Sequence, residues 1–291
     1  MNYLFHILII LQIYIILALS LNLKTGYTGL LSLCQAAFYG TGAYLTTMMM
    51  VHFNFNFFGA ILIAIIANIL INALITTWLA IRLRNLYFTL ATIALQIVFF
   101  GIVYNWQSVT QGPAGISGIP KPVIGSFEFS TPVSFALLSL AFTSMTVIFF
   151  WFFPKTQLCR MLECTREDEV WLTVLGKRPG YFKLISISLS VAFATIAGAL
   201  YATYMSYIDP TSFNMDESIL ILTIILVGGT GNVIGPVSGA AIYVLLPELL
   251  RFINIPDSFA ANIRMIIYAV ILILIVRLKP NGLFGKFEIK G

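Results

Sequence analysis

Nine apolar runs, most of them long enough to cross a lipid bilayer, dominate this sequence. A helix needs about 20 apolar residues to cross the hydrocarbon core. The runs cover residues 3–21, 28–51, 57–81, 86–105, 133–153, 184–207, 218–227, 233–250 and 263–278. The seventh run is short and ends at a glycine cluster, so it is either a crossing or a broken helix. The sequence therefore predicts an all-α membrane protein, a polytopic bundle of eight or nine transmembrane helices that forms one transmembrane domain over residues 1–291.

The composition excludes several other classes of protein. Hydrophobic residues make up 59% of the 291 residues and charged residues only 9%, against about 25% charged residues in an average soluble domain. So few charges exclude a soluble enzyme, a disordered chain and a nucleic-acid-binding domain, and the lipid bilayer is the expected solvent. The net charge of +5 then reflects basic cytoplasmic loops rather than a nucleic-acid partner.

The basic residues predict the orientation of the chain, because Lys and Arg collect in cytoplasmic loops. The loop 155–183 holds six basic residues and the tail 277–290 holds four, and three more are Lys24, Arg82 and Arg84. The loops expected on the other side, 106–132, 208–217 and 251–262, together carry Lys121 and Arg251. We therefore expect a multi-pass protein of the cell membrane (inner or plasma) with the loop 155–183 in the cytoplasm.

The middle of each run lacks Asp, Glu, Lys and Arg. An ion-driven carrier usually keeps an ionisable group there, so its absence weighs against a secondary carrier. A sodium site formed by backbone carbonyls needs no such group and stays compatible with the sequence. Asn68 and Asn72 are four residues apart and share a helix face. We expect them to form hydrogen bonds between helices or to line a translocation path.

The sequence offers no catalytic, metal or nucleotide site. His6 and His52 pair with nothing at motif spacing, and the three cysteines form neither a disulfide framework nor a metal site. Neither Gly176-Lys177 nor Gly285-Lys286 continues with the Ser or Thr of a Walker A motif. We expect no cofactor in this chain, and ATP, if it drives transport, must be bound by partner subunits.

Glycine-rich segments interrupt the apolar runs. Glycines allow a tight break between helices or a close approach of a neighbouring helix, and a break inside the membrane is tolerated only where it is buried in protein or lines a cavity. The candidate residues for a translocation path and its broken helices are Gly26, Gly29, Gln35, Gly40, Gly42, Asn68, Asn72, Gly228, Gly229, Gly231 and Gly235. A further segment, 110–120, holds three Gly and two Pro and predicts an ordered external loop, which is either a simple turn or a gate or docking surface.

The loop 155–183 carries the densest charge in the chain. Arg166-Glu167-Asp168-Glu169 is followed by apolar residues and then by Gly176, which predicts a short helix that ends at this glycine. A cytoplasmic helix that exposes Trp171 and Leu172 requires a protein partner or the bilayer surface. The loop is therefore either a solvated segment that lies on lipid or a coupling helix that inserts into a motor subunit.

Taken together, these segments resemble the permeases of branched-chain amino acid ABC importers, the LivM-type subunit. The resemblance runs from about residue 18 to residue 285. It is carried by Gly26-Tyr27-Thr28-Gly29 through Tyr44, the loop 112–120, Arg166-Glu167-Asp168-Glu169 with Gly176 and Lys183, the run Ala197-Gly198-Ala199-Leu200-Tyr201-Ala202, and Gly228 to Gly239. Each motif is weak alone, and their shared order is specific.

The resemblance implies a complex of two membrane permeases, two cytoplasmic ATPase subunits and an external or periplasmic substrate-binding protein. This chain would form half of the pore and pass a small amino acid with an apolar side chain. The residues that would couple it to the ATPase are Arg160, Arg166, Glu167, Asp168, Glu169, Gly176 and Lys183.

The sequence departs from the family pattern at several positions. Cys34-Gln35 stands where the family usually has Gly-His, Gln111 and Cys159 each replace a Gly, and Trp171-Leu172 replaces small residues. The first change bears on substrate preference and the last on the choice of motor partner. A permease for urea or short-chain amides and a stand-alone secondary carrier remain alternatives. A structural scaffold is a third, but it would not need the ordered glycine breaks.

Overall fold

Helices make up nearly all of the regular structure in the computed structural model, which describes residues 2–83, 86–124 and 127–251 together with residues 266, 269–270, 273–274, 277, 279 and 282–285. The helices are α1 (Asn2–Asn22), α2 (Gln35–Val51), α3 (Phe57–Asn68), α4 (Leu74–Arg82), α5 (Leu86–Asn105), α6 (Gln107–Thr110), α7 (Pro132–Phe152), α8 (Gln157–Glu167), α9 (Glu169–Val174), α10 (Pro179–Met205), α11 (Met215–Gly228) and α12 (Ile234–Arg251). The short strands are β1 (Ile116–Ser117), β2 (Val123–Ile124), β3 (Phe127–Glu128) and β4 (Tyr207–Ile208). The predicted all-α membrane architecture is confirmed.

Five of the described helical segments are long and apolar enough to cross a membrane. They are Tyr3–Tyr27, Phe57–Arg82, Leu86–Asn105, Pro132–Lys155 and Pro179–Met205, and they match five of the predicted runs. The runs 218–227 and 233–250 correspond to the shorter apolar helices α11 and α12, and the run 263–278 lies largely outside the described residues. The predicted count of eight or nine crossings is therefore not confirmed.

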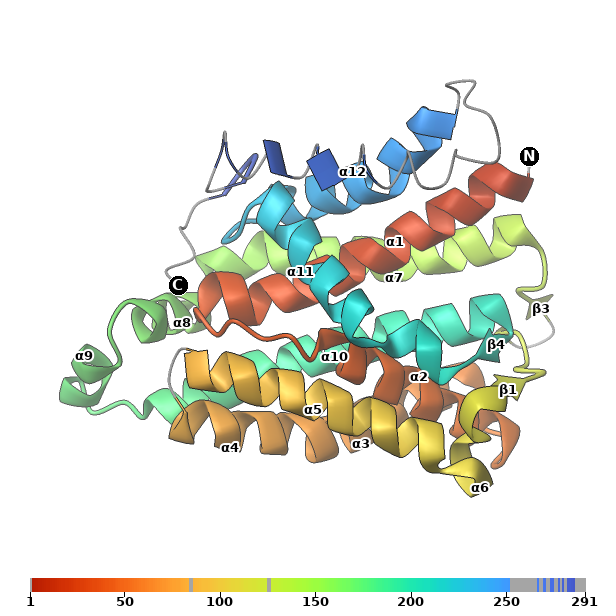
Figure 1. Cartoon of the computed structure of the whole chain (residues 1–291), viewed down its shortest axis with the longest axis horizontal. Coiled ribbons are helices and arrows are strands. Elements are labelled where there is room, and N and C mark those ends of the chain that lie inside the picture. The colour runs from red at the N-terminus through yellow and green to blue at the C-terminus, as the bar shows by residue number, and fades with distance from the viewer. Residues whose placement is uncertain are drawn as a thin grey trace.

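The run 28–51 is not one helix, which corrects the prediction. Residues 28–34 are non-helical, with Gly29 at φ +73°, and Figure 1 shows this segment returning from the α8 end of the bundle to the start of α2. The first turn of α2 is therefore buried, and its backbone N–H groups need partners. Side chains provide them, since Ser218 Oγ accepts from Ala36 at 2.9 Å and Gln96 Oε1 accepts from Ala37 at 2.8 Å.

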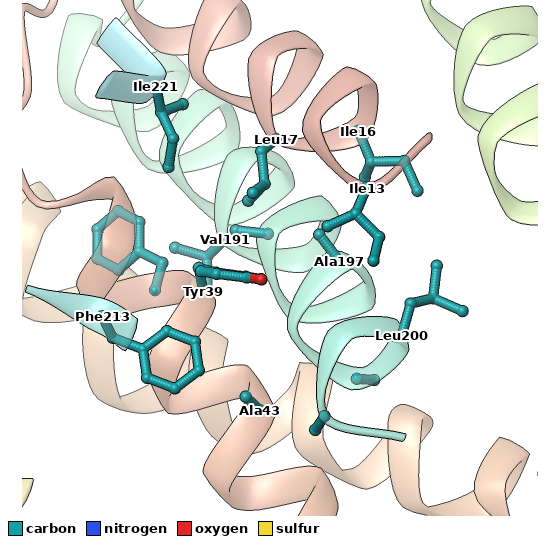
Figure 2. Close-up of a cluster of buried hydrophobic side chains, with 14 of the residues drawn as sticks. Ile13, Ile16, Leu17, Tyr39, Ala43, Val191, Ala197, Leu200, Phe213 and Ile221 are labelled. Atoms are coloured by element: carbon teal, nitrogen blue, oxygen red, sulfur yellow. The ribbon is translucent and has the colours of Figure 1, made fainter. Parts of the chain in front are cut away.

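The core lies where α1, α2 and α10 meet. Figure 2 shows Leu17 of α1, Tyr39 of α2 and Val191 of α10 directed into this shared cluster. Helix α10 approaches α2 so closely that a Cβ on Gly198 would lie 2.7 Å from the backbone nitrogen of Ala43. With 27 residues at about 1.5 Å per residue, α10 is the longest described helix and runs about 40 Å through the bundle.

Those predicted loops that the structure describes lie at opposite ends of the bundle according to the side of the membrane expected for them (Figure 1). Helices α8 and α9 occupy one end, where α4 also ends at Arg82. Strands β1 and β4 and helix α6 occupy the other end. Strand β1 pairs antiparallel with β4, with Ile116 opposite Ile208, so the external loop is fixed to the end of α10.

Candidate functional site

The first glycine break, at Gly26 and Gly29, and the second glycine break, at residues 228–231, are far apart in the sequence. They meet at the side chain of Asn22. The Asn22 side chain accepts a hydrogen bond from Gly231 N at 3.0 Å and donates one to the Asn232 carbonyl at 2.8 Å. A Cβ on Gly26 would lie 2.9 Å from Gly231 N, so only glycine permits this contact. Gly26 and residues 228–231 are therefore buried in protein, as the bilayer requires of non-helical backbone, whereas Gly29 is exposed. Asn22 is not among the predicted site residues, although an asparagine at a helix end beside Gly26 was a usable signal.

The second break is closed by a segment near the C-terminus. Helix α11 ends at Gly228, and Gly229 has φ +104°. The carbonyls of Val227 and Gly228 accept hydrogen bonds from Leu283 N and Phe284 N, each at 2.9 Å. These bonds satisfy carbonyl groups that a helix leaves free at its C-terminal end. The short length predicted for this run and its termination at the glycine cluster are confirmed.

Asn68 and Asn72 lie at a junction of α2, α3 and α10. Asn68 Nδ2 donates to the Phe38 carbonyl at 2.9 Å and to Thr195 Oγ1 at 2.7 Å, and Asn72 Nδ2 donates to Thr41 Oγ1 at 3.1 Å. The prediction of hydrogen bonds between helices is confirmed, and a role in the translocation path stays a prediction. Gly40 and Gly42 are packing positions, because a Cβ on Gly40 would lie 2.7 Å from the Phe99 ring and one on Gly42 2.5 Å from Thr195 Cα.

Lys24 is a buried cation at the end of the first span, outside the uncharged mid-span regions of the prediction. The first span continues through a π-helical turn, Leu23–Tyr27, so Lys24 lies within it. The Lys24 side chain is fully buried, and its Nζ lies 4.3 Å from the centre of the Phe38 ring without a hydrogen-bond partner among the described residues. A desolvated cation–π contact stabilises by ~2 kcal/mol, whereas burying an ion costs several kcal/mol. The ring alone therefore does not compensate for burying the charge.

The predicted coupling loop forms two helices, α8 and α9, that are anchored to the membrane helices. Lys183 of α10 lies 2.7 Å from the Glu169 carboxylate and donates to the Ala80 carbonyl of α4 at 2.8 Å. The Arg166 guanidinium donates to the Gly26 carbonyl in the first glycine break. Partial burial lowers the pKa of Arg166, and the nearby carboxylates of Glu167 and Glu163 act in the opposite direction.

A cavity of about 350 Å³ lies between this loop and the start of the second run. It is lined by the first glycine break, by α5 and by the anchoring residues, among them Gly29, Thr89, Arg166, Glu169 and Lys183. The structure thus gathers the predicted coupling residues Arg166, Glu169 and Lys183 around one cavity. Glu167 and Asp168 also line the cavity, whereas Arg160 is exposed and does not line it.

Helix α9 exposes an apolar face, but not the predicted one. Asp168 caps the helix by accepting from Val170 N at 2.7 Å, and Gly176, at φ +70°, follows its end at Val174. The exposed fractions of Trp171 and Val174 are 68% and 72%, whereas Leu172 is fully buried. The prediction is therefore right for Trp171 and wrong for Leu172. The exposed apolar residues are Val170, Trp171, Val174 and Leu175.

The external loop is held against the far end of α10. Lys121 Nζ donates to the carbonyls of Thr203 and Tyr204 at 2.9 and 2.7 Å, where a cation also favours the negative end of the helix. Burial lowers the pKa of Lys121, opposed by Glu128. Gln111 has φ +59°, a left-handed conformation that favours glycine. The ordered loop with special backbone angles is confirmed.

Comparisons with known proteins agree with this architecture. A family model described as the permease component of the branched-chain amino acid transport system matches residues 3–276. The high-affinity branched-chain amino acid transport permease LivM of Salmonella typhimurium is 29% identical, over 94% of this chain and 68% of its own length. The probable LivM permease of Methanocaldococcus jannaschii is 25% identical, over 94% of this chain and 91% of its own length.

A more distant relative is named for the import of a different substrate. The autoinducer 2 import system permease LsrC of Yersinia pestis is 24% identical, over 71% of this chain and 58% of its own length. No solved structure matches the chain.

Proposed function

This chain belongs to the family of branched-chain amino acid transport permease components, and from that premise we propose that it forms half of the membrane pore of an ATP-driven importer for amino acids with apolar side chains. It is a multi-pass protein of the inner membrane. In the proposed complex it pairs with a second permease, two cytoplasmic ATPase subunits bind the ATP, and an external binding protein delivers the substrate.

The observation that carries the proposal is the linkage of α9 to two membrane helices through Lys183. The exposed apolar face around Trp171 offers a docking surface for an ATPase subunit, and Glu169, at the start of the same helix, is paired with Lys183 of α10. Lys183 also contacts the end of α4. A displacement of α9 by the motor would therefore act on α10 and α4 together.

Helix α10 carries this displacement to the other end of the bundle. Its last turn holds Lys121 of the external loop, and strand β4 directly after it pairs with β1 of that loop. Because α10 is one continuous helix of 27 residues, a displacement at Lys183 would move its other end as well. The hydrogen bond between the Thr203 carbonyl and Lys121 would then shift. ATP binding would in this way change the populations of outward-facing and inward-facing states.

The experiment that tests the function is substrate competition in the complete reconstituted importer. Uptake of radiolabelled L-leucine should depend on ATP and on the external binding protein, and unlabelled isoleucine and valine should compete. Competition by urea or acetamide with no effect of isoleucine would instead assign the chain to urea or short-chain amide transport. ATP-independent uptake would assign it to the secondary carriers.

A further inference from the structure

The end of the first span and the start of α2 form a buried polar seam. Ser20 and Lys24 lie one helical turn apart on one side, and Gln35 and Phe38 lie one turn apart on the other. Two contacts cross the seam, because Gln35 Nε2 donates to Ser20 Oγ at 2.6 Å and Lys24 Nζ lies 4.3 Å from the Phe38 ring centre. Lys24 and Gln35 therefore lie on the two facing sides of this seam.

Two groups of opposite polarity in this seam lack partners. Lys24 and Gln35 are each fully buried, and Lys24 Nζ and Gln35 Oε1 have no hydrogen-bond partner among the described residues. The ion pair found in the described part of the chain joins Lys183 to Glu169 and does not involve Lys24. Because buried polar groups are almost always paired, an unpaired donor beside an unpaired acceptor indicates that a ligand with both kinds of group belongs there.

The backbone around this seam departs from a regular α-helix. Lys24 lies in a π-helical turn, a feature frequent at functional sites. Residues 28–34 between the two helices are non-helical. The seam also lies at the N-terminal end of α2, whose dipole favours an anion, while the Ala36 and Ala37 N–H groups are already bonded. Lys24 is thus the free cationic donor at this helix end in the described structure.

We propose that Lys24 and Gln35 form the point inside the permease where a zwitterionic amino acid is held during passage. The Lys24 ammonium group binds the substrate carboxylate, and Gln35 Oε1 accepts from the substrate ammonium group. The inference rests on the proposed function and narrows its substrate to compounds that carry a carboxylate, which urea and neutral amides lack. The groups are enclosed by this chain's own side chains, so a small molecule that enters as the seam opens is a better partner than a surface of another subunit.

The test compares leucine uptake and ATP hydrolysis in complete importers reconstituted in proteoliposomes. Lys24→Met should lower leucine uptake about tenfold or more, the effect of losing a charge-assisted hydrogen bond, while ATP hydrolysis stimulated by the binding protein persists. Lys24→Arg should keep most of the uptake. Leu23→Met is the matched control, because Leu23 is buried in the same turn without a charge. Uptake by Lys24→Met close to wild type, or an equal loss of ATP hydrolysis and uptake, would overturn the proposal.

A second measurement decides the matter if Lys24→Met fails to assemble. A cryo-electron microscopy structure of the wild-type importer, trapped with ADP-vanadate and leucine, should show the leucine carboxylate in contact with Lys24 Nζ. A leucine carboxylate held by other side chains would overturn the proposal. The two claims fail separately, since a wild-type importer that takes up no leucine contradicts the proposed function, whereas an active importer that is insensitive to Lys24 contradicts this site alone.

Discussion

The carboxylate of Glu169 lies 2.7 Å from Nζ of Lys183, and the same ammonium group donates to the carbonyl of Ala80. The side chain of Lys183 is 5% exposed and that of Glu169 is 44% exposed. One buried lysine thus joins a cytoplasmic helix to two membrane helices. A pair with one buried member should stabilise the contact more than a surface pair does, and in the proposed importer it is the point where motion of α9 enters the membrane domain.

Reversing the charge of Glu169 should uncouple the importer. Glu169→Lys places two ammonium groups together and removes a pair of about 1–2 kcal/mol, between the values for exposed and buried pairs. Leucine taken up per ATP hydrolysed should fall about tenfold, while the chain stays inserted in the membrane. Lys177→Glu is the matched control, because Lys177 is exposed in the same loop and lies outside both the predicted coupling residues and the described ion pair. Equal losses in the two variants would contradict this role of Lys183.

The contact of α8 with the first glycine break should be sensitive to a single methyl group. At Gly29, φ is +73° and a Cβ would lie 2.9 Å from Arg166 Cγ. Gly29→Ala should therefore cost about 1–2 kcal/mol in backbone strain and displace Arg166. Thermal unfolding of the purified chain in detergent measures this loss. Gly101→Ala is the control, since a Cβ there meets nothing within 4 Å, and it should stabilise α5 by about 0.5–1 kcal/mol. A neutral Gly29→Ala would contradict the close contact.

Trp171 and Leu172 are adjacent in the chain, but Trp171 is exposed and Leu172 is buried. A serine at Trp171 should therefore affect binding of the ATPase subunit, and a serine at Leu172 should affect the stability of the fold. Trp171→Ser should change the free energy of unfolding by less than about 0.5 kcal/mol and weaken co-purification with the ATPase subunit. Leu172→Ser should cost about 3 kcal/mol, because it removes a buried leucine from the packing of α8 and α9. Thermal unfolding and affinity co-purification measure the two effects. Unchanged ATPase binding by Trp171→Ser would contradict the docking surface.

Removing Lys121 should loosen the external loop from α10. Lys121→Met deletes two charge-assisted hydrogen bonds to helix-end carbonyls, a local loss of about 1–3 kcal/mol. Amide hydrogen exchange should quicken in residues 112–124 and in the last turn of α10. Lys155→Met, at the other end of the bundle, should leave that exchange unchanged. Slow exchange in Lys121→Met would show that the β1–β4 pairing alone holds the loop.

Much of the fold follows from hydropathy, because a helix in lipid requires an unbroken apolar stretch. The run 86–105 corresponds to α5, Leu86–Asn105, without a shift. The run 28–51 misled the prediction, since residues 28–34 are apolar yet non-helical. Hydropathy does not distinguish an apolar helix from an apolar segment buried against other helices, and here Gly29 with its positive φ carried the better signal.

The contacts of the site were less predictable, because they join residues far apart in the chain. The sequence singled out Gly26 and Gly231 separately, but only the fold shows that Asn22 connects the two breaks. Lys24 was counted among the basic residues of the cytoplasmic side, and its burial in the π-helical turn that ends the first span was not predicted. The partners of a side chain depend on tertiary packing, which periodicity does not encode.

The most direct test of the account is leucine transport by the purified chain alone compared with the complete importer in the same proteoliposomes. The account predicts leucine uptake only when the second permease, the ATPase subunits, the binding protein and ATP are all present. Uptake by this chain alone, in liposomes without ATP, would contradict the claim that it is a pore half driven by a separate motor.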